Sequence, residues 1–461
     1  MDKYVYLYPN ITIKSYKNTT FKIYYLVVED KEDKNYRIEE KIFKINDVGK
    51  EILLLLDGTF TYREIIRHFM KKYNEPEEVV DKKVSSFIVN LKKQNYLFCE
   101  QDKPEIHNIN YFEYDNYYPT VASLELTNTC NIRCKHCYGD FGERNNSCTI
   151  NLDNIKKIIS SLSEIGLSIL ELTGGDPTMN PHCSDAIEYA MESGIGTVML
   201  LTNGINISPK LFNTLKKYKK NIYVQIDLHS LNETYYDWFT TSKGNLEKVK
   251  KNIEYLILNG IKVRICSIFT PGNIDEVYQI GKWAHEHGAL EYAPSVVVNI
   301  GRSENNKGLL FEDIDQLYKF KELQKSISIE YPGFIQEVAE IEGMTRKNCG
   351  AIRSELSIDA FGNIKLCNMD SGENFNLKLG NVLKKSVKVI FDNNKEFLDS
   401  LLDVKLPDLT QNSCKNCSER TFCHNCLLRG FLSAKKLNQE HKVCDWYSSL
   451  PGIIKNRFSL D

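Results

Sequence analysis

All but four of the fourteen cysteines in this 461-residue chain fall into groups, and grouped thiols in a chain without secretion signals are typical metal ligands. The first group is Cys130, Cys134 and Cys137, in the segment Cys130-Asn-Ile-Arg-Cys134-Lys-His-Cys137-Tyr138. The second set lies near the C-terminus and comprises Cys349, Cys367, Cys414, Cys417, Cys423, Cys426 and Cys444. The solitary cysteines need no such role, because free cysteine packs as a small apolar residue; they are Cys99, Cys148, Cys183 and Cys266.

Three thiolates in one short loop can each bind one corner of a 4Fe–4S cube. The cube has a fourth iron, which stays open for a substrate or cofactor, as one position does at catalytic zinc. A structural zinc site is the alternative, with His136 as its fourth ligand. Three cysteines and an interleaved histidine over so few residues make a poor tetrahedral cage, so the pattern favours the iron–sulfur cluster.

Composition and charge limit the class of protein. Lys and Arg number 59 and Asp and Glu 61, which gives a net charge of −2 and argues against a chain that mainly wraps nucleic acid. The N-terminus lacks the layout of a signal peptide, and no apolar run approaches the ~20 residues of a membrane span. We therefore expect a cytoplasmic protein that has no membrane or nucleic-acid partner.

The elements that must position the first cysteine group alternate between strand and helix from residue 121. Apolar runs of strand length occupy 121–127, 167–173, 197–203, 222–228, 261–269 and 290–300, and amphipathic helices fit the segments 153–165, 245–258 and 274–287. Six β-α repeats predict a parallel sheet covered by helices, an α/β fold with too few strands for a closed eight-stranded barrel. We expect an open, partial (β/α)6 TIM-like barrel over 121–310, with its site at the C-terminal strand ends.

The spacing Cys130-x3-Cys134-x2-Cys137 after a first strand resembles the signature of radical S-adenosylmethionine (SAM) enzymes. The segment Gly174-Gly175-Asp176-Pro177 after the second strand resembles the Gly-Gly-Glu-Pro segment of that family, which contacts the SAM amino group; Asp176 replaces the usual Glu. The resemblance implies that the cysteines hold a SAM-binding 4Fe–4S cluster. It also implies that SAM is cleaved to a 5′-deoxyadenosyl radical, which removes a hydrogen atom from an unactivated carbon.

Polar residues on later strands are weaker candidates for SAM contacts, because each could equally be a satisfied polar group of a strand end. They are Asn203, Gln225, Asp227 and Arg264. The family segment often reads Gln-Ile-Ser-Leu-Asp-Gly, whereas this chain reads Gln225-Ile-Asp-Leu-His-Ser230. The carboxylate has therefore moved by two positions, and the roles of Asp227 and His229 stay open.

The C-terminal cysteines resemble the SPASM extension of radical SAM peptide-modifying enzymes, which holds two auxiliary 4Fe–4S clusters. The resemblance rests on Gly362-x4-Cys367 and on the Cys-x2-Cys-x5-Cys run from Cys414, although the gap before Cys426 is one residue shorter than usual. It implies one cluster at Cys414, Cys417, Cys423 and Cys444. It implies another at Cys349, Cys367 and Cys426, with an open iron that could bind a substrate thiolate, for a total of three clusters. Zinc-ribbon sites, with His424 joining, are the alternative.

The chain divides by composition into several parts. We expect a bridging helical region over 311–345 and a SPASM unit over 346–461 that is too rich in loops to hold together without its metal sites. Residues 101–120, polar and aromatic, are interpreted as a linker.

Residues 1–100 predict a winged-helix unit. Strands are expected at 4–8, 21–28 and 36–45, a helix after Asn46, a helix with a Thr61–Glu64 capping box, a third helix with an apolar stripe from Val80 to Leu91, and a closing strand at 96–98. This unit resembles the PqqD-like recognition element that binds leader peptides, which would add to a strand edge. The paired lysines of this unit are also compatible with DNA binding, but they are explained more simply as residues on the solvent-exposed faces of helices.

Together the three resemblances point to maturases of ribosomally made peptides, similar to the sactipeptide and ranthipeptide thioether synthases. The implied reaction joins a cysteine sulfur to a carbon of another residue in a precursor peptide that binds through its leader, with a reduced flavodoxin- or ferredoxin-type electron donor. Epimerisation, carbon–carbon crosslinking or other tailoring of a peptide is an alternative. A sulfatase-maturing enzyme shares the SPASM pattern but not the recognition unit. A zinc-stabilised winged-helix DNA-binding regulator is the hypothesis from another class.

Overall fold

The computed structural model describes residues 3–7, 12–16, 23–26, 41–44, 47–93, 97–106, 109–114, 116–139, 141–142, 147–311, 313–335, 347–372, 375, 377–408 and 414–460. The chain forms two compact units, residues 1–117 and 118–461, which are described separately. No helix among the described residues combines the length and the apolar character that crossing a membrane requires.

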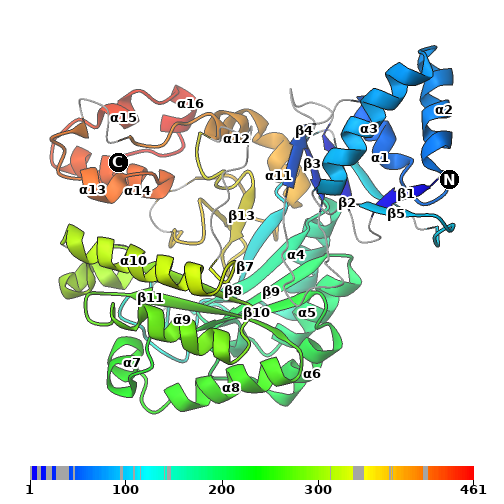
Figure 1. The fold of residues 1–461 in the computed structure, drawn as a ribbon. Helices are drawn as coiled ribbons and strands as arrows, with labels where there is room; N and C mark the ends of the chain where they lie inside the picture. The colour runs from blue at the N-terminus through cyan, green and yellow to red at the C-terminus, as the bar shows by residue number, and fades with distance from the viewer. Residues whose placement is uncertain are drawn as a thin grey trace. The chain divides into compact units, whose positions relative to one another are not determined.

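The first unit is built around three helices and closed by a pair of short strands (Figure 1). Strand β1 (Tyr4–Leu7) pairs antiparallel with β5 (Leu97–Glu100), and β3 (Ile23–Leu26) pairs antiparallel with β4 (Lys41–Lys44). Between β4 and β5 lie α1 (Asp47–Leu54), α2 (Tyr62–Tyr73) and α3 (Glu77–Lys93). The predicted order of three helices and a closing strand is confirmed. The outer residues of the predicted strands and Asn46 lie outside the described residues.

Helix α2 begins where the sequence predicts it. The Thr61 side chain accepts a hydrogen bond from the Glu64 backbone N–H, and the Glu64 carboxylate accepts one from the Thr61 N–H at 2.8 Å. This confirms the capping box, which satisfies two N–H groups that have no partner inside the helix.

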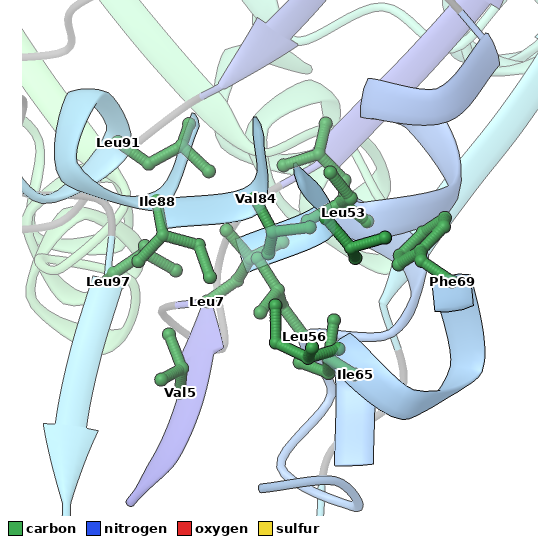
Figure 2. Packing of buried hydrophobic residues seen from close by; sticks show 13 residues of the cluster. Val5, Leu7, Leu53, Leu56, Ile65, Phe69, Val84, Ile88, Leu91 and Leu97 are labelled. Atoms are coloured by element: carbon green, nitrogen blue, oxygen red, sulfur yellow. The ribbon is translucent and has the colours of Figure 1, made fainter. Parts of the chain in front are cut away.

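Apolar side chains from each of these helices meet those of β1 and β5 in one core (Figure 2). The labelled members of this core are Val5, Leu7, Leu53, Leu56, Ile65, Phe69, Val84, Ile88, Leu91 and Leu97, all buried. Because each fully buried aliphatic or Phe side chain contributes ~1.5–3 kcal/mol, this core stabilises the unit without any metal.

The sequence analysis missed two strands of the first unit. Strand β2 (Thr12–Tyr16) pairs in parallel with β6 (Asn110–Tyr114), with Thr12 opposite Asn110. Strand β6 lies inside the segment that was expected to be a linker, 101–120, so part of that segment is an ordered strand rather than a connection. The mixture of Tyr and Phe with Asn and Glu in β6 obscures the alternation that marks a strand.

The second unit is built on an eight-stranded sheet in the order β12-β11-β10-β9-β8-β7-β13-β14. Strands β7 to β12 are parallel throughout, which confirms the six-repeat open α/β sheet. Their bounds are β7 (Val121–Thr127), β8 (Ile169–Gly174), β9 (Thr197–Thr202), β10 (Ile222–Asp227), β11 (Lys262–Phe269) and β12 (Glu291–Val296).

Helices follow these strands and lie along the outer side of the sheet in Figure 1. They are α4 (Leu152–Glu164), α5 (Cys183–Glu192), α6 (Pro209–Lys217), α7 (Glu233–Thr240), α8 (Leu246–Leu258), α9 (Glu276–Glu286) and α10 (Ile314–Glu330). Three short 3-10 turns lie in the connections, namely η1 (Pro177–Met179), η2 (Gly301–Asn305) and η3 (Lys307–Leu309). Along β10, Ile222, Val224 and Ile226 are fully buried. Because side chains alternate along a strand, Gln225 and Asp227 point to the opposite face of the sheet.

Two strands of the C-terminal segment extend this sheet, which the sequence analysis did not predict. Strand β13 (Glu355–Ile358) pairs in parallel with β7, and β14 (Ile364–Lys365) pairs antiparallel with β13. Across this junction the Lys365 ammonium contacts the Glu125 carboxylate of β7, and their side chains are 3% and 7% exposed. The C-terminal segment is thus part of the same compact unit as the barrel sheet.

The C-terminal segment has apolar packing beside its cysteines, and its dependence on metal sites stays a prediction. It contains α11 (Val387–Asn393), α12 (Lys395–Leu402), α13 (Arg420–Cys423), α14 (Leu427–Gln439), α15 (Asp445–Ser448) and α16 (Gly452–Lys455). The rings of Phe431 and Phe458 stack at 3.8 Å, and Phe375 and Trp446 pack against this pair. Burial of aromatic side chains is a large stabilising contribution, so this segment has a core of its own.

The buried pair across the sheet junction gives a stability prediction. Lys365→Met leaves the Glu125 carboxylate buried without its cation, and we expect a loss of ~3–5 kcal/mol in the free energy of unfolding. Adding Glu125→Leu removes the uncompensated charge and should recover most of that loss. Urea unfolding of the metal-free protein measures both values.

The exposed pair of Lys282 and Glu286, 3.9 Å apart in α9, is the matched control for this prediction. Lys282→Met should cost ~0.5 kcal/mol or less, because solvent screens this pair. A Lys365→Met variant that is no less stable than the Lys282→Met variant would contradict the role given to the buried pair.

Candidate functional site

The first cysteine group lies in the loop that follows β7, at the C-terminal edge of the parallel strands. All three thiols are free and only partly buried, and Cys134 lies close enough to Cys130 and Cys137 for their charges to act on it. Burial raises the pKa of the Cys130 thiol to about 12 and holds the pKa of the Cys134 thiol well above its ordinary value. In the absence of metal these groups are therefore protonated at neutral pH, and a coordinated metal is what would hold them as thiolates.

Close backbone contact with β8 fixes the start of this loop. The Gly175 N–H donates to the Thr127 carbonyl and the Asp176 N–H to the Thr129 carbonyl, both at 2.9 Å. A Cβ atom at Gly174 or at Gly175 would lie 2.1 Å from one of these two carbonyl oxygens. Packing alone therefore requires glycine at both positions, because no side chain fits between the two backbones.

The Asp176 carboxylate fixes the turn after β8. Its Oδ1 accepts hydrogen bonds from the N–H and hydroxyl of Thr178, and its Oδ2 accepts from the Thr202 hydroxyl at 2.8 Å and the Asn203 N–H at 2.9 Å. Asp176 is 1% exposed, so its carboxylate is held by the protein at the ends of β8 and β9. The predicted SAM contact of this segment would then come from its backbone.

Asn203 joins the end of β9 to the cysteine loop. Its side-chain amide donates to the Asn131 Oδ1 at 2.7 Å and lies 3.9 Å from the Cys130 sulfur. On the far side, the Lys135 N–H donates to the Phe239 carbonyl at 2.9 Å, at the end of α7. The loop is thus held between three elements before any cofactor binds.

The remaining predicted SAM contacts share one face of β10 and β11. In the register of β10 and β11, Gln225 lies opposite Arg264. Asp227 lies opposite Cys266, two residues nearer the C-terminal edge of the sheet. Arg264 pairs with Glu291 of β12 at 3.6 Å. No hydrogen bond or ion pair to the Asp227 carboxylate occurs within the described part of the chain, and burial raises its pKa to about 7. The SAM-binding roles of these residues stay predictions.

Two histidines complete the surroundings of Cys134. The rings of His136 and Phe239 stack at 4.5 Å, and His229 meets His136 edge-on at 4.7 Å. The His229 Nδ1 accepts the Ile268 N–H at 3.2 Å, and burial lowers its pKa to about 3, so this ring is neutral. The sequence analysis named both histidines but left the role of His229 open, because only the fold brings this residue, just after β10, next to the cysteine loop.

Cys134, His136 and His229 have potential ligand atoms within 4.8 Å of one another. They supply one sulfur and two nitrogens, one ligand fewer than a closed structural zinc site takes. This set differs from the zinc alternative of three cysteines with His136, of which it contains only Cys134 and His136.

The C-terminal cysteines form two groups in space. Cys426 lies close enough to Cys349 and to Cys367 to affect the pKa of both thiols. The charges of Cys414, Cys417 and Cys444 act in the same way on Cys423. These are the two sets that the SPASM resemblance implies, although their ligand roles stay predictions.

Tyr138 connects the first cysteine group to the group that contains Cys367. Burial raises the pKa of its phenol well above the ordinary value, and the charges of Glu125, Cys137 and Cys367 add to the effect. Cys137 of the first group and Cys367 of the C-terminal group therefore both lie close enough to this phenol for their charges to act on it.

Comparison with known families decides the class of protein. Residues 124–284 match the radical SAM superfamily, residues 28–97 match coenzyme PQQ synthesis protein D (PqqD), and residues 349–426 match SPASM, an iron–sulfur cluster-binding domain. The chain is a radical SAM enzyme. Its three domains follow the predicted order, which goes against the zinc-stabilised DNA-binding regulator.

Two curated proteins illustrate the relation of this enzyme to others. It is 26% identical over 405 residues to the antilisterial bacteriocin subtilosin biosynthesis protein AlbA of Bacillus subtilis, across 87% of this chain and 88% of AlbA. It is 25% identical to an AdoMet-dependent heme synthase of Methanosarcina barkeri, across 71% of this chain and 96% of that protein.

The solved structure of Streptococcus suis SuiB bound to S-adenosylmethionine has a similar fold. The TM-score is 0.61 at 13% identity, across 93% of this chain and 96% of SuiB. SuiB bound to precursor peptide SuiA matches with a TM-score of 0.59. At this identity the likeness concerns the fold of the chain.

The glycine pair gives a direct test of how the loop is held. Gly175→Ala places a methyl group against a backbone oxygen, so we expect a loss of ~1–3 kcal/mol in the free energy of unfolding and fewer irons bound. Gly452→Ala is the control, because a Cβ there has no heavy atom within 4 Å. Equal stability of the two variants in chemical unfolding would contradict the close approach.

The raised pKa of Asp227 predicts a pH dependence of stability. Because the folded-state pKa is raised to about 7, the folded protein resists ionisation of this group, and stability falls as the pH rises from the ordinary Asp value to about 7. Asp227→Asn should therefore stabilise the metal-free protein by a few kcal/mol at pH 8 and by less at pH 5. Urea unfolding at both pH values measures the difference, and an equal effect at both would exclude the raised pKa.

Proposed function

We propose that this radical SAM enzyme modifies a ribosomally made precursor peptide by joining a cysteine sulfur to a carbon of another residue. The observation that carries the proposal is the group of Cys349, Cys367 and Cys426, because Cys426 lies close enough to act on both other thiols. Cys367 of this group and Cys137 of the first group both act on the phenol of Tyr138. The similarity to AlbA along most of both chains supports a peptide as the substrate.

The residues at the first site fit a SAM-binding 4Fe–4S cluster. Cys130, Cys134 and Cys137 are free, partly exposed and mutually close, and a loop that is already ordered carries them. When bound there, SAM and the cluster supply a carbon-centred radical that can remove a hydrogen atom from a peptide carbon. We assign Gly174, Gly175, Asp176 and Pro177 to the SAM amino group, and Asn203, Gln225, Asp227 and Arg264 to its other polar groups.

The C-terminal groups supply the second half of the proposed chemistry. Formation of the C–S bond removes one hydrogen atom from carbon and one proton from sulfur, so one electron must also leave the peptide. A metal at Cys349, Cys367 and Cys426 would favour the thiolate form of the substrate cysteine and could accept that electron. Cys414, Cys417, Cys423 and Cys444 would hold the third cluster with all four positions closed.

The proposed partners follow from the domain order. The PqqD-like unit would bind the leader of the precursor peptide by strand addition, and SuiB has been solved with its precursor peptide. A reduced flavodoxin- or ferredoxin-type protein would supply the electron that starts each turnover, in the cytoplasm.

Iron analysis after anaerobic reconstitution tests the cluster assignment. We expect about twelve irons per chain, and about eight in a variant with Cys130, Cys134 and Cys137 all replaced by alanine. The same triple variant should form no 5′-deoxyadenosine from SAM under reducing conditions. Cys99→Ala, at a solitary cysteine, is the control and should keep both properties. Stoichiometric zinc with little iron, unchanged in the triple variant, would contradict the proposal.

Mass spectrometry of a co-expressed, cysteine-containing precursor tests the thioether itself. Each bond should lower the peptide mass by two hydrogens and protect one cysteine from alkylation. A product of unchanged mass would instead indicate epimerisation, and lost hydrogens with a free thiol would indicate a different crosslink.

A further inference from the structure

Arg302, which no motif singled out, reaches into the loop of the first cysteine group. It lies in η2, just after the last barrel strand. Its Nε donates to the Cys134 carbonyl at 2.8 Å, its Nη1 donates to the Phe141 carbonyl at 2.7 Å, and its own backbone N–H donates to the Cys137 carbonyl at 3.0 Å. One residue thus binds the carbonyls of the second and third cysteines of the segment and that of Phe141 beyond it.

The turn that carries Arg302 packs against the same backbone. Gly301 has a φ of +67°, and a Cβ there would lie 2.4 Å from the Tyr138 carbonyl and 2.5 Å from the Cys137 carbonyl. The Ser303 hydroxyl, which is fully buried, donates within the turn and accepts the Ile300 N–H at 2.9 Å. The guanidinium therefore extends from a fixed turn and not from a free loop.

Arg302 also places a positive charge beside the thiols. Its charge lowers the pKa of Cys130 and of Cys134, against the larger effect of burial. Three thiolates on a 4Fe–4S cube give the site a net negative charge that increases on reduction. Hydrogen bonds and charges around such a cluster are among the factors that set its reduction potential.

We propose that Arg302 is the positioning residue of the SAM-cluster site, fixing the cysteine loop through its carbonyls and stabilising the reduced cluster with its charge. The inference rests on the proposed function, because it presumes a cluster at Cys130, Cys134 and Cys137. It adds a residue outside the cysteine motif and links the end of the last barrel strand to the loop after the first.

The test compares Arg302→Gln, which removes the charge, with Arg302→Lys, which keeps the charge and removes the planar fork of donors. In the reconstituted full-length protein we expect Arg302→Gln to lower the reduction potential of the first cluster and to weaken its SAM-induced change in the electron paramagnetic resonance spectrum. Arg302→Lys should restore the potential in part, which a purely structural role would not predict. Subtraction of the triple-cysteine variant spectrum isolates the first cluster from the auxiliary ones.

Controls distinguish a folding defect from a failure of the Arg302 inference or of the proposed function. The irons of the two auxiliary clusters, about eight per chain, should persist in both variants and show that the chain has folded. Arg133→Gln removes an exposed arginine from the same loop and should leave the potential unchanged. An Arg302→Gln protein with unchanged potential and spectrum overturns the inference, whereas equal iron in wild type and triple variant overturns the proposed function itself.

Discussion

Main-chain atoms at the end of β8 and in the loop after β7 lie so close together that only glycine fits at positions 174 and 175. This contact determines where the first cysteine group can be. It aligns the Asp176 N–H with the Thr129 carbonyl, next to Cys130, and the Asp176 carboxylate then ties the turn to the end of β9. The cysteine loop is therefore held by backbone contacts that come from the protein itself.

A continuous sheet connects the first cysteine group to the group that contains Cys367. Cys130 follows β7, β7 pairs with β13, and Cys367 follows β14, the partner of β13. The buried pair of Lys365 and Glu125 spans the same junction. Because packed sheets deform little, the two cysteine groups keep a fixed relation within the second unit, and one thiol of each acts on the phenol of Tyr138. A fixed relation of this kind is what the proposed thioether chemistry would require, because a peptide radical has a short lifetime.

In the C-terminal segment, the cysteines that are proposed to bind clusters lie in the same segment as a group of packed aromatic rings. Its cysteines lie in turns and at helix ends, whereas Phe431, Phe458 and Trp446 form an aromatic core beside them. Aromatic packing therefore contributes to the stability of the segment alongside the proposed cluster sites. The first unit has an apolar core of its own.

The sequence by itself determined the class of fold and the candidate metal ligands. Local patterns carry this information: the 3.6- and 2-residue periods gave six strands close to their observed bounds, and the capping box at Thr61 is a contact between near neighbours in the chain. The grouping of the cysteines came from spacing and family resemblance. In each case the deciding residues lie within one short segment.

Only the tertiary structure decided which distant residues surround those ligands. His229 and Arg302 reach the cysteine loop from 92 and more residues away along the chain, and β13 joins β7 across more than two hundred residues. Strand β6 likewise depends on its pairing with β2, because its own residues show no clear alternation. Contacts of this kind arise from packing between whole elements, and a periodicity or a motif reports only on the element that contains it.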